Sequence, residues 1–344
     1  MPSVTIDAGV LAAPPVGGST ADAHRYVETL LDWSQLLDEP WVAIYMSERA
    51  SESLFEDALF PLRDQLKKLF SATGIIEFDV NTVATVVDRL LQLTPSFETY
   101  FRIRDVLTED LITEPDILRL CSGTRLRSDL ARCVVLIAIL RRHCQEPVSD
   151  HALILRNSPG SIIKVRAIIR LLEHERNDLD MPPDYFAGEV LVCDNFRGLI
   201  GCLDESAILC KATDIVGVAT AVRIAIYKTR LAHGLEPDWD DVSNFRVGTE
   251  FLMSLHKNML SQSIAANLLQ AIVDTIEGNS MARTHALRTG TGGGNPQLVR
   301  KSDQAKAWRR DVDSEHHLHY WFCEEGIVEF ASMSFPHDDY SIPE

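Results

Sequence analysis

The chain has 344 residues, 46% of them hydrophobic, and a net charge of −17 with an isoelectric point near 5.1. This length and composition are typical of a globular protein with one large or two ordinary domains. The acidic balance argues against a body that coats nucleic acid through clustered Lys and Arg.

The sequence also predicts a soluble, cytoplasmic protein without a membrane partner. Its first eighteen residues contain no basic region followed by a long apolar run, so we expect neither a secretory signal nor an anchor there. The longest apolar stretch, Cys133–Leu140, is far shorter than a bilayer span. Seven cysteines without a CxxC pair, most of them within apolar runs, are typical of reduced, buried thiols.

Taken in chain order, the segments predict a mainly α fold. Residues 1–20 are rich in Gly, Pro, Ser and Ala and predict a flexible lead-in. Residues 21–278 predict a helical body with few short strands, at 40–48 and 188–196. Apolar spacing, N-cap residues and glycine stop signals indicate its helices at 21–38, 50–70, 81–93, 128–143, 161–175, 214–233 and 249–277. Pro61 is expected to kink or split the second of these helices.

Charge is segregated in the last sixty-odd residues. Residues 283–310 carry seven Lys and Arg against one acid, whereas residues 311–344 carry nine acids, four histidines and no Lys or Arg. Residues 279–304 lack apolar periodicity and predict a flexible basic linker. We consider three interpretations of the basic arm: a solvated linker, docking onto an acidic surface, or contact with nucleic acid phosphates through Arg300, Lys301, Lys306, Arg309 and Arg310.

Residues 305–344 predict an acidic, histidine-rich β-hairpin appendage. From His316 the pattern has a period of two, Glu324-Glu325-Gly326 forms a turn, and residues 327–335 form the return strand. Because a lone two-stranded hairpin is marginal in water, its aromatic residues must be buried against the body, a second copy or a protein partner. The expected partner-binding residues are Tyr320, Trp321, Phe322 and Phe330.

The same hairpin carries the candidate chemistry. His317 and His319 share a strand face, a spacing at which two imidazoles can bind a divalent metal, although no cofactor is required. Further metal ligands would be Asp311, Asp313, Glu315, His337, Asp338 and Asp339. A metal-free phosphodiester cleavage by His317, His319, Arg309, Arg310 and Asp311 is the alternative, with His as acid or base and Arg stabilising the transition state. The simpler interpretation is that these histidines are half-exposed and hydrogen-bonded to neighbouring carboxylates.

Residues 308–321, WRRDVDSEHHLHYW, precede a turn and a second strand, and this layout resembles the sheet of RelE-type bacterial toxins. The resemblance covers the last forty residues, and the long helical body is foreign to those small toxins. It implies a ribonuclease-type activity in a toxin-like or bacterial defence setting.

These observations predict three functions. The first is a scaffold or adapter subunit of a cytoplasmic, bacterial-type multi-protein assembly, with the hairpin as the docking element. The alternative is a phosphodiester-cleaving enzyme, a nuclease-type hydrolase that uses the C-terminal His, Arg and Asp residues. The third is a nucleic-acid-binding regulator that acts through residues 283–310. The absence of a specific catalytic motif favours the scaffold.

Overall fold

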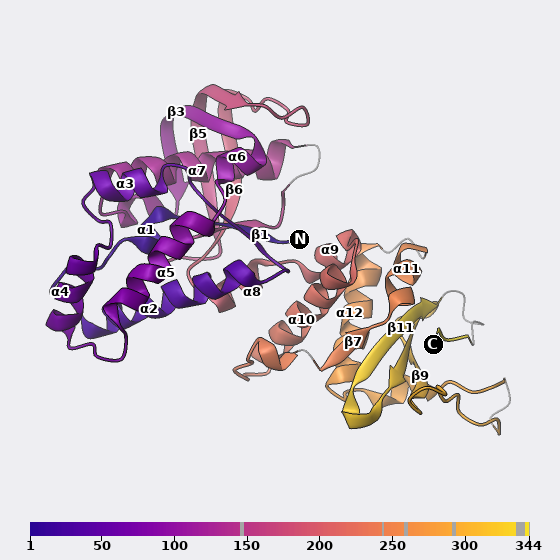
Figure 1. Ribbon diagram of the computed structural model, residues 1–344. Helices are drawn as coiled ribbons and strands as arrows, with labels where there is room; N and C mark the ends of the chain where they lie inside the picture. The colour runs from indigo at the N-terminus through magenta and orange to yellow at the C-terminus, as the bar shows by residue number, and fades with distance from the viewer. Residues whose placement is uncertain (145–147, 243, 258–260, 291–293, 335–340, 344) are drawn as a thin grey trace. The chain divides into compact units, whose positions relative to one another are not determined.

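The computed structural model describes all residues except 145–147, 243, 258–260, 291–293, 335–340 and 344. The chain divides into two compact units, an N-terminal unit, Pro2–Cys202, and a C-terminal unit, Leu203–Glu344. It is 45% helical and 24% strand, with mixed sheets of six and five strands (Figure 1). The prediction of a mainly α, all-α chain is therefore wrong, because each unit is built on a sheet. None of the described helices is both long and apolar enough to cross a membrane.

The sheet of the N-terminal unit has the strand order β2-β1-β4-β6-β5-β3. Neighbouring strands are parallel from β2 to β6, and β5 is antiparallel to both β6 and β3. The strands are β1 (Ser3–Ile6), β2 (Ala43–Met46), β3 (Ile103–Glu114), β4 (His151–Ile154), β5 (Ile162–His174) and β6 (Tyr185–Cys193). The helices are α1 (Ala8–Leu11), α2 (Thr20–Gln35), α3 (Ala50–Glu56), α4 (Arg63–Thr73), α5 (Val80–Leu93), α6 (Phe97–Phe101), α7 (Thr124–His143) and α8 (Phe196–Cys202), with the 3-10 turns η1 (Leu36–Asp38) and η2 (Ile117–Leu120).

Several of these helices follow from local sequence signals. Helix α2 begins after Ser19, whose Oγ accepts a hydrogen bond from the backbone N–H of Asp22 at 3.0 Å. Pro61 lies between α3 and α4, which together replace the single helix expected at 50–70. Helix α7 has buried residues on every side from Cys133 to Leu140 and packs against β3, β5 and β6, so it forms the centre of the core.

Two predictions for this unit are wrong. The flexible lead-in at 1–20 contains β1, whose four residues are all buried in the middle of the sheet. The helix expected at 161–175 is the strand β5, in which buried Ile163 and Val165 alternate with exposed Lys164 and Arg166. That alternation has the period of a strand with one buried face.

A neutral histidine joins the first and fourth strands. The two ring nitrogens of His151 lie 2.8 Å from the hydroxyl oxygens of Ser3 and Thr5. Complete burial, together with the nearby charge of Arg141, lowers the pKa of His151 to about 3. The imidazole is therefore uncharged and serves as a polar link within the core.

The C-terminal unit has a five-stranded sheet in the order β7-β11-β10-β9-β8, parallel between β7 and β11 and otherwise antiparallel. Its strands are β7 (Phe245–Val247), β8 (Thr284–Ala286), β9 (Lys306–Asp311), β10 (His317–Phe322) and β11 (Val328–Ser334). Its helices are α9 (Glu205–Lys211), α10 (Ile215–Ala232), α11 (Thr249–Lys257) and α12 (Gln262–Ile276), with the 3-10 turns η3 (Asp240–Val242), η4 (Met281–Arg283) and η5 (Glu324–Gly326).

The predicted hairpin strands do pair, as β10 and β11, but they do not form an appendage. Strands β9 and β7 flank them, and α11 and α12 pack against the same sheet. The predicted flexible linker at 279–304 also differs, because its described residues include β8 and form two isolated bridges, Arg288 with Gln297 and Val299 with Lys306. Residues 291–293 of the glycine-rich stretch lie outside the described residues.

Candidate functional site

A candidate site lies at the carboxyl edge of the parallel strands in the N-terminal unit. Asp7, Ser47 and Leu155 directly follow β1, β2 and β4. The chain passes from β1 to β2 on one side and later returns to β4 on the other side. In open α/β sheets, ligands bind outside the carboxyl ends of the strands at such a switch of direction.

A cavity of about 50 Å³ lies at this edge, with room for roughly three water molecules. Its polar lining residues are Asp7, Cys121, Ser122, Arg156 and Asn157. Burial, followed by the negative charge of Asp7, raises the pKa of Cys121 to about 12. This cysteine therefore remains a thiol and is not an activated nucleophile.

Asp7 is the most unusual group of the cavity. It is 8% exposed, and its Oδ2 accepts one hydrogen bond, from the backbone N–H of Gly9 at 3.0 Å. A Cβ at position 9 would lie 2.6 Å from that oxygen, so the close contact requires glycine. Its Oδ1 accepts no hydrogen bond from any residue that the structure describes. Burial, followed by the charge of Asp129, raises the pKa of Asp7 to about 7.

A second carboxylate, Asp129 in the first turns of α7, lies outside the lining of the cavity but close enough for its charge to raise the pKa of Asp7. It is 4% exposed, and its Oδ1 lies 2.7 Å from Ser47 Oγ and 3.0 Å from Arg132 Nη2. Burial raises the pKa of Asp129, while Arg132 and Ser47 act in the opposite direction. Within the described part of the chain, its Oδ2 accepts no hydrogen bond. Asp7 and Asp129 thus each present one unsatisfied oxygen.

Glu98 of α6 lies in the same polar network but has a different role. It accepts hydrogen bonds from the backbone N–H of Glu48 and from Ser96 Oγ, both at 3.0 Å, and pairs with Arg132. All three ionised groups of the Glu98, Arg132 and Asp129 cluster are buried. Because Glu98 is fully compensated, we interpret it as a residue that positions Arg132, and through it Asp129.

Arg156 supplies an uncompensated positive charge to the same cavity. Its Nη1 donates to the carbonyl oxygen of Ala12 at 3.1 Å, and its guanidinium lies 5.9 Å from the centre of the Tyr26 ring. Burial lowers the pKa of Arg156, and the residue forms no ion pair with any described residue. Burying a charge without a counterion is costly, so the buried Asp7 and the half-buried Arg156 together suit a charged ligand.

The donor set limits which cation the site could hold. Among the described residues there is no group of three or more His, Cys, Asp or Glu side chains suited to a metal. Asp7 and Asp129 provide two carboxylates. Mg²⁺ is commonly bound by one or two carboxylates together with water and substrate phosphate, so this pair suits Mg²⁺ better than a structural zinc ion.

The structure brings four of the five predicted catalytic residues together in the C-terminal unit. His317, His319, Arg309 and Asp311 share one face of β9 and β10, and Arg310 lies on the other face. His317 Nδ1 lies 3.0 Å from Asp311 Oδ1, and His319 Nδ1 lies 3.5 Å from Ser332 Oγ. Both histidines are buried, contrary to the expectation of half-exposed side chains. His337, Asp338 and Asp339 lie outside the described residues.

Two of the predicted nucleic-acid-binding residues are neutralised within the C-terminal unit. Arg310 is 1% exposed and pairs with Asp274 at 3.1 Å. Arg300 is buried and pairs with Asp303 at 2.6 Å and with Glu329 at 2.7 Å. The other three are Lys301 and Lys306, which are exposed, and Arg309, which is half-buried.

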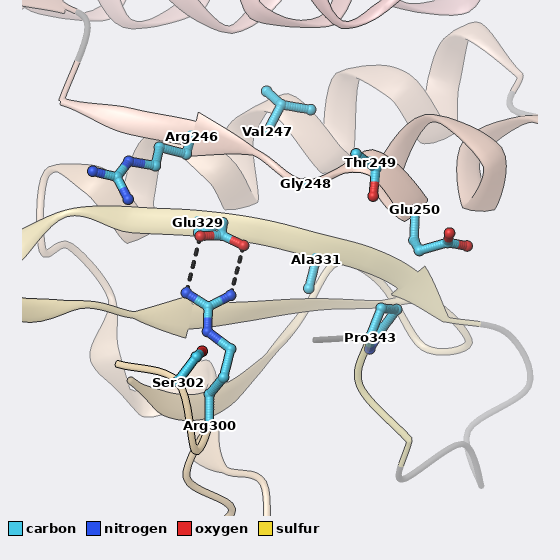
Figure 2. Close-up of a pocket in the computed structure, with 10 residues that line it drawn as sticks. All are labelled: Arg246, Val247, Gly248, Thr249, Glu250, Arg300, Ser302, Glu329, Ala331 and Pro343. Carbon is cyan, nitrogen blue, oxygen red and sulfur yellow. Dashed lines mark hydrogen bonds and ion pairs between the residues drawn. The ribbon is translucent and has the colours of Figure 1, made fainter. Parts of the chain in front are cut away.

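Arg300 also lines a second cavity, of about 380 Å³, with Arg246, Gly248 and Thr249 at the start of α11. Figure 2 shows its guanidinium directed at the carboxylate of Glu329 across this cavity. Because Arg300 is held by two acids, it offers little free charge to a ligand, and the cavity is a weaker candidate than the Asp7 site.

Three of the four predicted partner-binding aromatics belong to the core of the C-terminal unit. Tyr320, Trp321 and Phe330 are buried, and the Phe330 ring lies 5.9 Å from the rings of Phe245 and Phe251. Trp321 Nε1 donates to the carbonyl oxygen of Pro343 at 2.7 Å. Phe322 differs from them, with 46% exposure.

Asp7, Asp129 and Arg156 are absent from the site residues that the sequence predicted. The available signal was the run of β-branched residues Val4-Thr5-Ile6 followed by Asp7-Ala8-Gly9, a pattern that ends a buried strand at a polar turn. Comparison of the chain with protein-family models, with curated proteins and with solved structures finds no match in any of the three.

Proposed function

We propose that the N-terminal unit is a divalent-cation-dependent phosphodiesterase whose centre is formed by Asp7, Asp129 and Arg156. The observation that carries the proposal is that a buried carboxylate and a half-buried guanidinium line one cavity without bonding to each other. Each is left uncompensated among the described residues. A ligand that carries both signs of charge, such as a phosphate with its cation, satisfies both groups.

The two carboxylates support the cation. Their charges repel each other, and each has an oxygen without a hydrogen bond in the described structure. A cation held by Asp7 and Asp129 would remove this repulsion. When bound, such an ion polarises a phosphoryl oxygen and lowers the pKa of a coordinated water molecule.

Arg156 supports a phosphate substrate. Guanidinium groups match phosphate oxygens with two parallel hydrogen bonds. The Ala12 carbonyl and the Tyr26 ring fix the side chain without neutralising it. Arg156 would therefore orient the phosphate and stabilise the charge that develops on it during hydrolysis.

Phosphodiester cleavage was also the alternative function suggested by the sequence, but there it was assigned to the His, Arg and Asp residues of the C-terminal unit. The predicted docking role in a multi-protein assembly stays a prediction. Three of the aromatic residues on which it depends are buried within the C-terminal unit.

The test is hydrolysis of bis(p-nitrophenyl) phosphate, measured with Mg²⁺ or Mn²⁺ and again with excess EDTA. We expect EDTA to abolish turnover, and Asp7→Asn and Asp129→Asn each to lower kcat/KM by about 100-fold or more, since a cation stabilises the transition state by several kcal/mol. Asp64→Asn, an exposed carboxylate of α4, is the matched control and should keep full activity. Turnover that survives both EDTA and Asp7→Asn would contradict the proposal.

A further inference from the structure

One edge of β6 is capped by arginine side chains rather than by a strand. In the described structure β4 pairs only with residues 191–193 of β6. Beyond β4, Arg142 donates to the carbonyl oxygen of Ala187, and Arg141 Nε donates to that of Glu189 at 3.2 Å. Both arginines come from the last turn of α7, so the fold concentrates positive charge beside this edge.

These arginines are part of a basic groove. They line a hollow of about 610 Å³ together with Lys164 and Arg166 of β5 and with Glu189 of β6. Four cations and one acid therefore meet in a protein whose net charge is −17.

Three of these four cations lack an acidic partner among the described residues, and Arg141 donates instead to the backbone carbonyl oxygens of Ser149, His151 and Glu189. Arg166 pairs with Glu114 at 3.1 Å, and both side chains are more than half exposed, so the pair is weak. Asp150 and Glu189 act on Arg141 only at a distance. Arg141, Arg142 and Lys164 form no ion pair of 4 Å or less with any residue in the described ranges.

An exposed aromatic ring lies on the same face of the sheet. Lys164 and Arg166 point away from α7, because the residues of β5 that alternate with them are buried against it. By register, Tyr185 lies opposite Ile168 on that outer face, two residues from Ala187, and is 81% exposed. Figure 1 shows β3, β5 and β6 side by side at this end of the N-terminal unit.

We propose that the basic groove and Tyr185 bind single-stranded nucleic acid, with Arg141, Arg142, Lys164 and Arg166 contacting successive phosphates and Tyr185 stacking on a base. A charged groove beside an exposed aromatic side chain is the combination by which proteins bind single strands. An acidic protein segment would satisfy the cations but would leave the tyrosine ring without a stacking partner.

Single-stranded nucleic acid is then the substrate class of the proposed phosphodiesterase. Its role as a substrate, as distinct from a bound ligand, rests on the proposed function. Twelve residues of α7 separate Asp129 from Arg141, a distance of about 18 Å along the helix. A few nucleotides span this distance, so one strand is long enough to contact both sites.

The test is fluorescence anisotropy of a labelled single-stranded oligonucleotide of about 15 nucleotides, a length that covers one binding surface. The titration is carried out in EDTA over a range of salt concentrations. The charge-removal variant is Arg142→Gln with Lys164→Gln and Arg166→Gln. A second variant, Lys164→Gln with Arg166→Gln, leaves the arginine caps of β6 intact. The matched control removes three exposed cations of α4 in the same unit: Arg63→Gln, Lys67→Gln and Lys68→Gln.

We expect the triple groove variant to bind at least about tenfold more weakly, with a log–log salt slope shallower by about 2, because three phosphate contacts are lost. The double variant should show about two thirds of that change in slope. Tyr185→Ser should weaken binding about fivefold or more without changing the slope. The α4 variant should bind like the parent.

Three results would overturn the inference: no binding by the parent, equal binding by the groove and α4 variants, or equally tight binding of a duplex or of polyglutamate. Because EDTA removes the cation, Asp7→Asn should bind the strand normally. A protein that binds the strand but hydrolyses no phosphodiester would refute the proposed function alone. Conversely, hydrolysis of bis(p-nitrophenyl) phosphate without any binding of the strand would refute this inference alone.

Discussion

The surroundings of Asp7 disfavour the ionised form of its carboxyl group. Its carboxyl is buried beside Asp129, and the pKa is raised from 3.8 to about 7. A raised pKa means that the folded state keeps a proton that the unfolded chain has already released. Asp7 therefore lowers the stability of the fold as it ionises, a cost that is typical of functional sites.

The first prediction is that Asp7→Asn stabilises the protein near neutral pH. In the parent, Asp7 should contribute a loss of stability between about pH 4 and pH 7, because the unfolded chain releases this proton first, and this contribution is up to about 1.4 kcal/mol per pH unit. The variant lacks this loss, so it should be more stable by roughly 2 to 4 kcal/mol at about pH 8 and nearly equal to the parent near pH 4. Urea denaturation without divalent cations measures the difference. A variant that is less stable than the parent at both pH values would contradict the burial of an ionised Asp7.

The second prediction is that His151 changes stability with pH in the direction opposite to that of Asp7. Its pKa is lowered from 6.5 to about 3, so the unfolded chain binds a proton that the folded state does not. Its contribution is present above about pH 6.5 and is lost as the pH falls toward 3. In the parent this slope opposes that of Asp7 between about pH 4 and 6.5. Asp7→Asn should therefore show stability that rises with pH over this window, and adding His151→Gln should flatten the profile. Parallel profiles for the two variants would refute this assignment.

Among the elements, α7 connects the core to both proposed sites. Its first turns place Asp129 and Arg132 in the buried network, its middle fills the core, and its last turn caps β6 with arginines. Most of this helix, at 128–143, was predicted from its apolar spacing and N-cap residue. The polar network could not be predicted, because Ser47 reaches Asp129, and Glu98 reaches Arg132, from elements distant in the chain.

The buried ion pairs of α7 should contribute strongly to stability. Arg132→Met removes the partner of Glu98 and Asp129 and should destabilise the protein by about 3 to 5 kcal/mol, because two buried carboxylates lose their counterion. Arg25→Met, an exposed arginine of α2, is the matched control and should change stability by less than about 0.5 kcal/mol. Chemical denaturation at neutral pH compares the two, and equal costs would refute a buried network.

The strands show where sequence reasoning failed. Strand β1 is buried on both faces, so its four residues have no alternation to reveal it next to a Gly- and Pro-rich stretch. Because β1 was not predicted, Asp7 fell within the segment that was predicted to be a flexible lead-in. The alternation in β5 was present in the sequence, but its Ile and Leu residues were interpreted as a helix. The hairpin of β10 and β11 was predicted from its period of two, whereas its flanking strands β7 and β9 were not.

At the scale of the whole molecule, the chain consists of two units with separate sheets and cores. Residues 21–278 were predicted to form one body, because periodicity describes single elements and does not reveal which of them share a core. The contacts divide the chain at Leu203 instead.

This division predicts that damage to one unit stays within it. Arg310→Met removes a buried charge that pairs with Asp274 and accounts for hydrogen bonds to the carbonyls of Asn279 and Ser280. We expect faster hydrogen exchange throughout residues 203–344 and unchanged exchange in residues 2–202, as measured by mass spectrometry. Acceleration across both units would show that they unfold as one cooperative body.

Isothermal titration calorimetry of Mn²⁺ into the metal-free protein tests the central claim most directly, because it measures binding at the Asp7 site without assuming a substrate. The account predicts a binding event in the parent and in Asp64→Asn that is lost in Asp7→Asn and in Asp129→Asn, while circular dichroism shows all four proteins folded. Heats of binding that are the same in Asp7→Asn and in the parent, or no binding by the parent, would contradict a cation site at the end of β1.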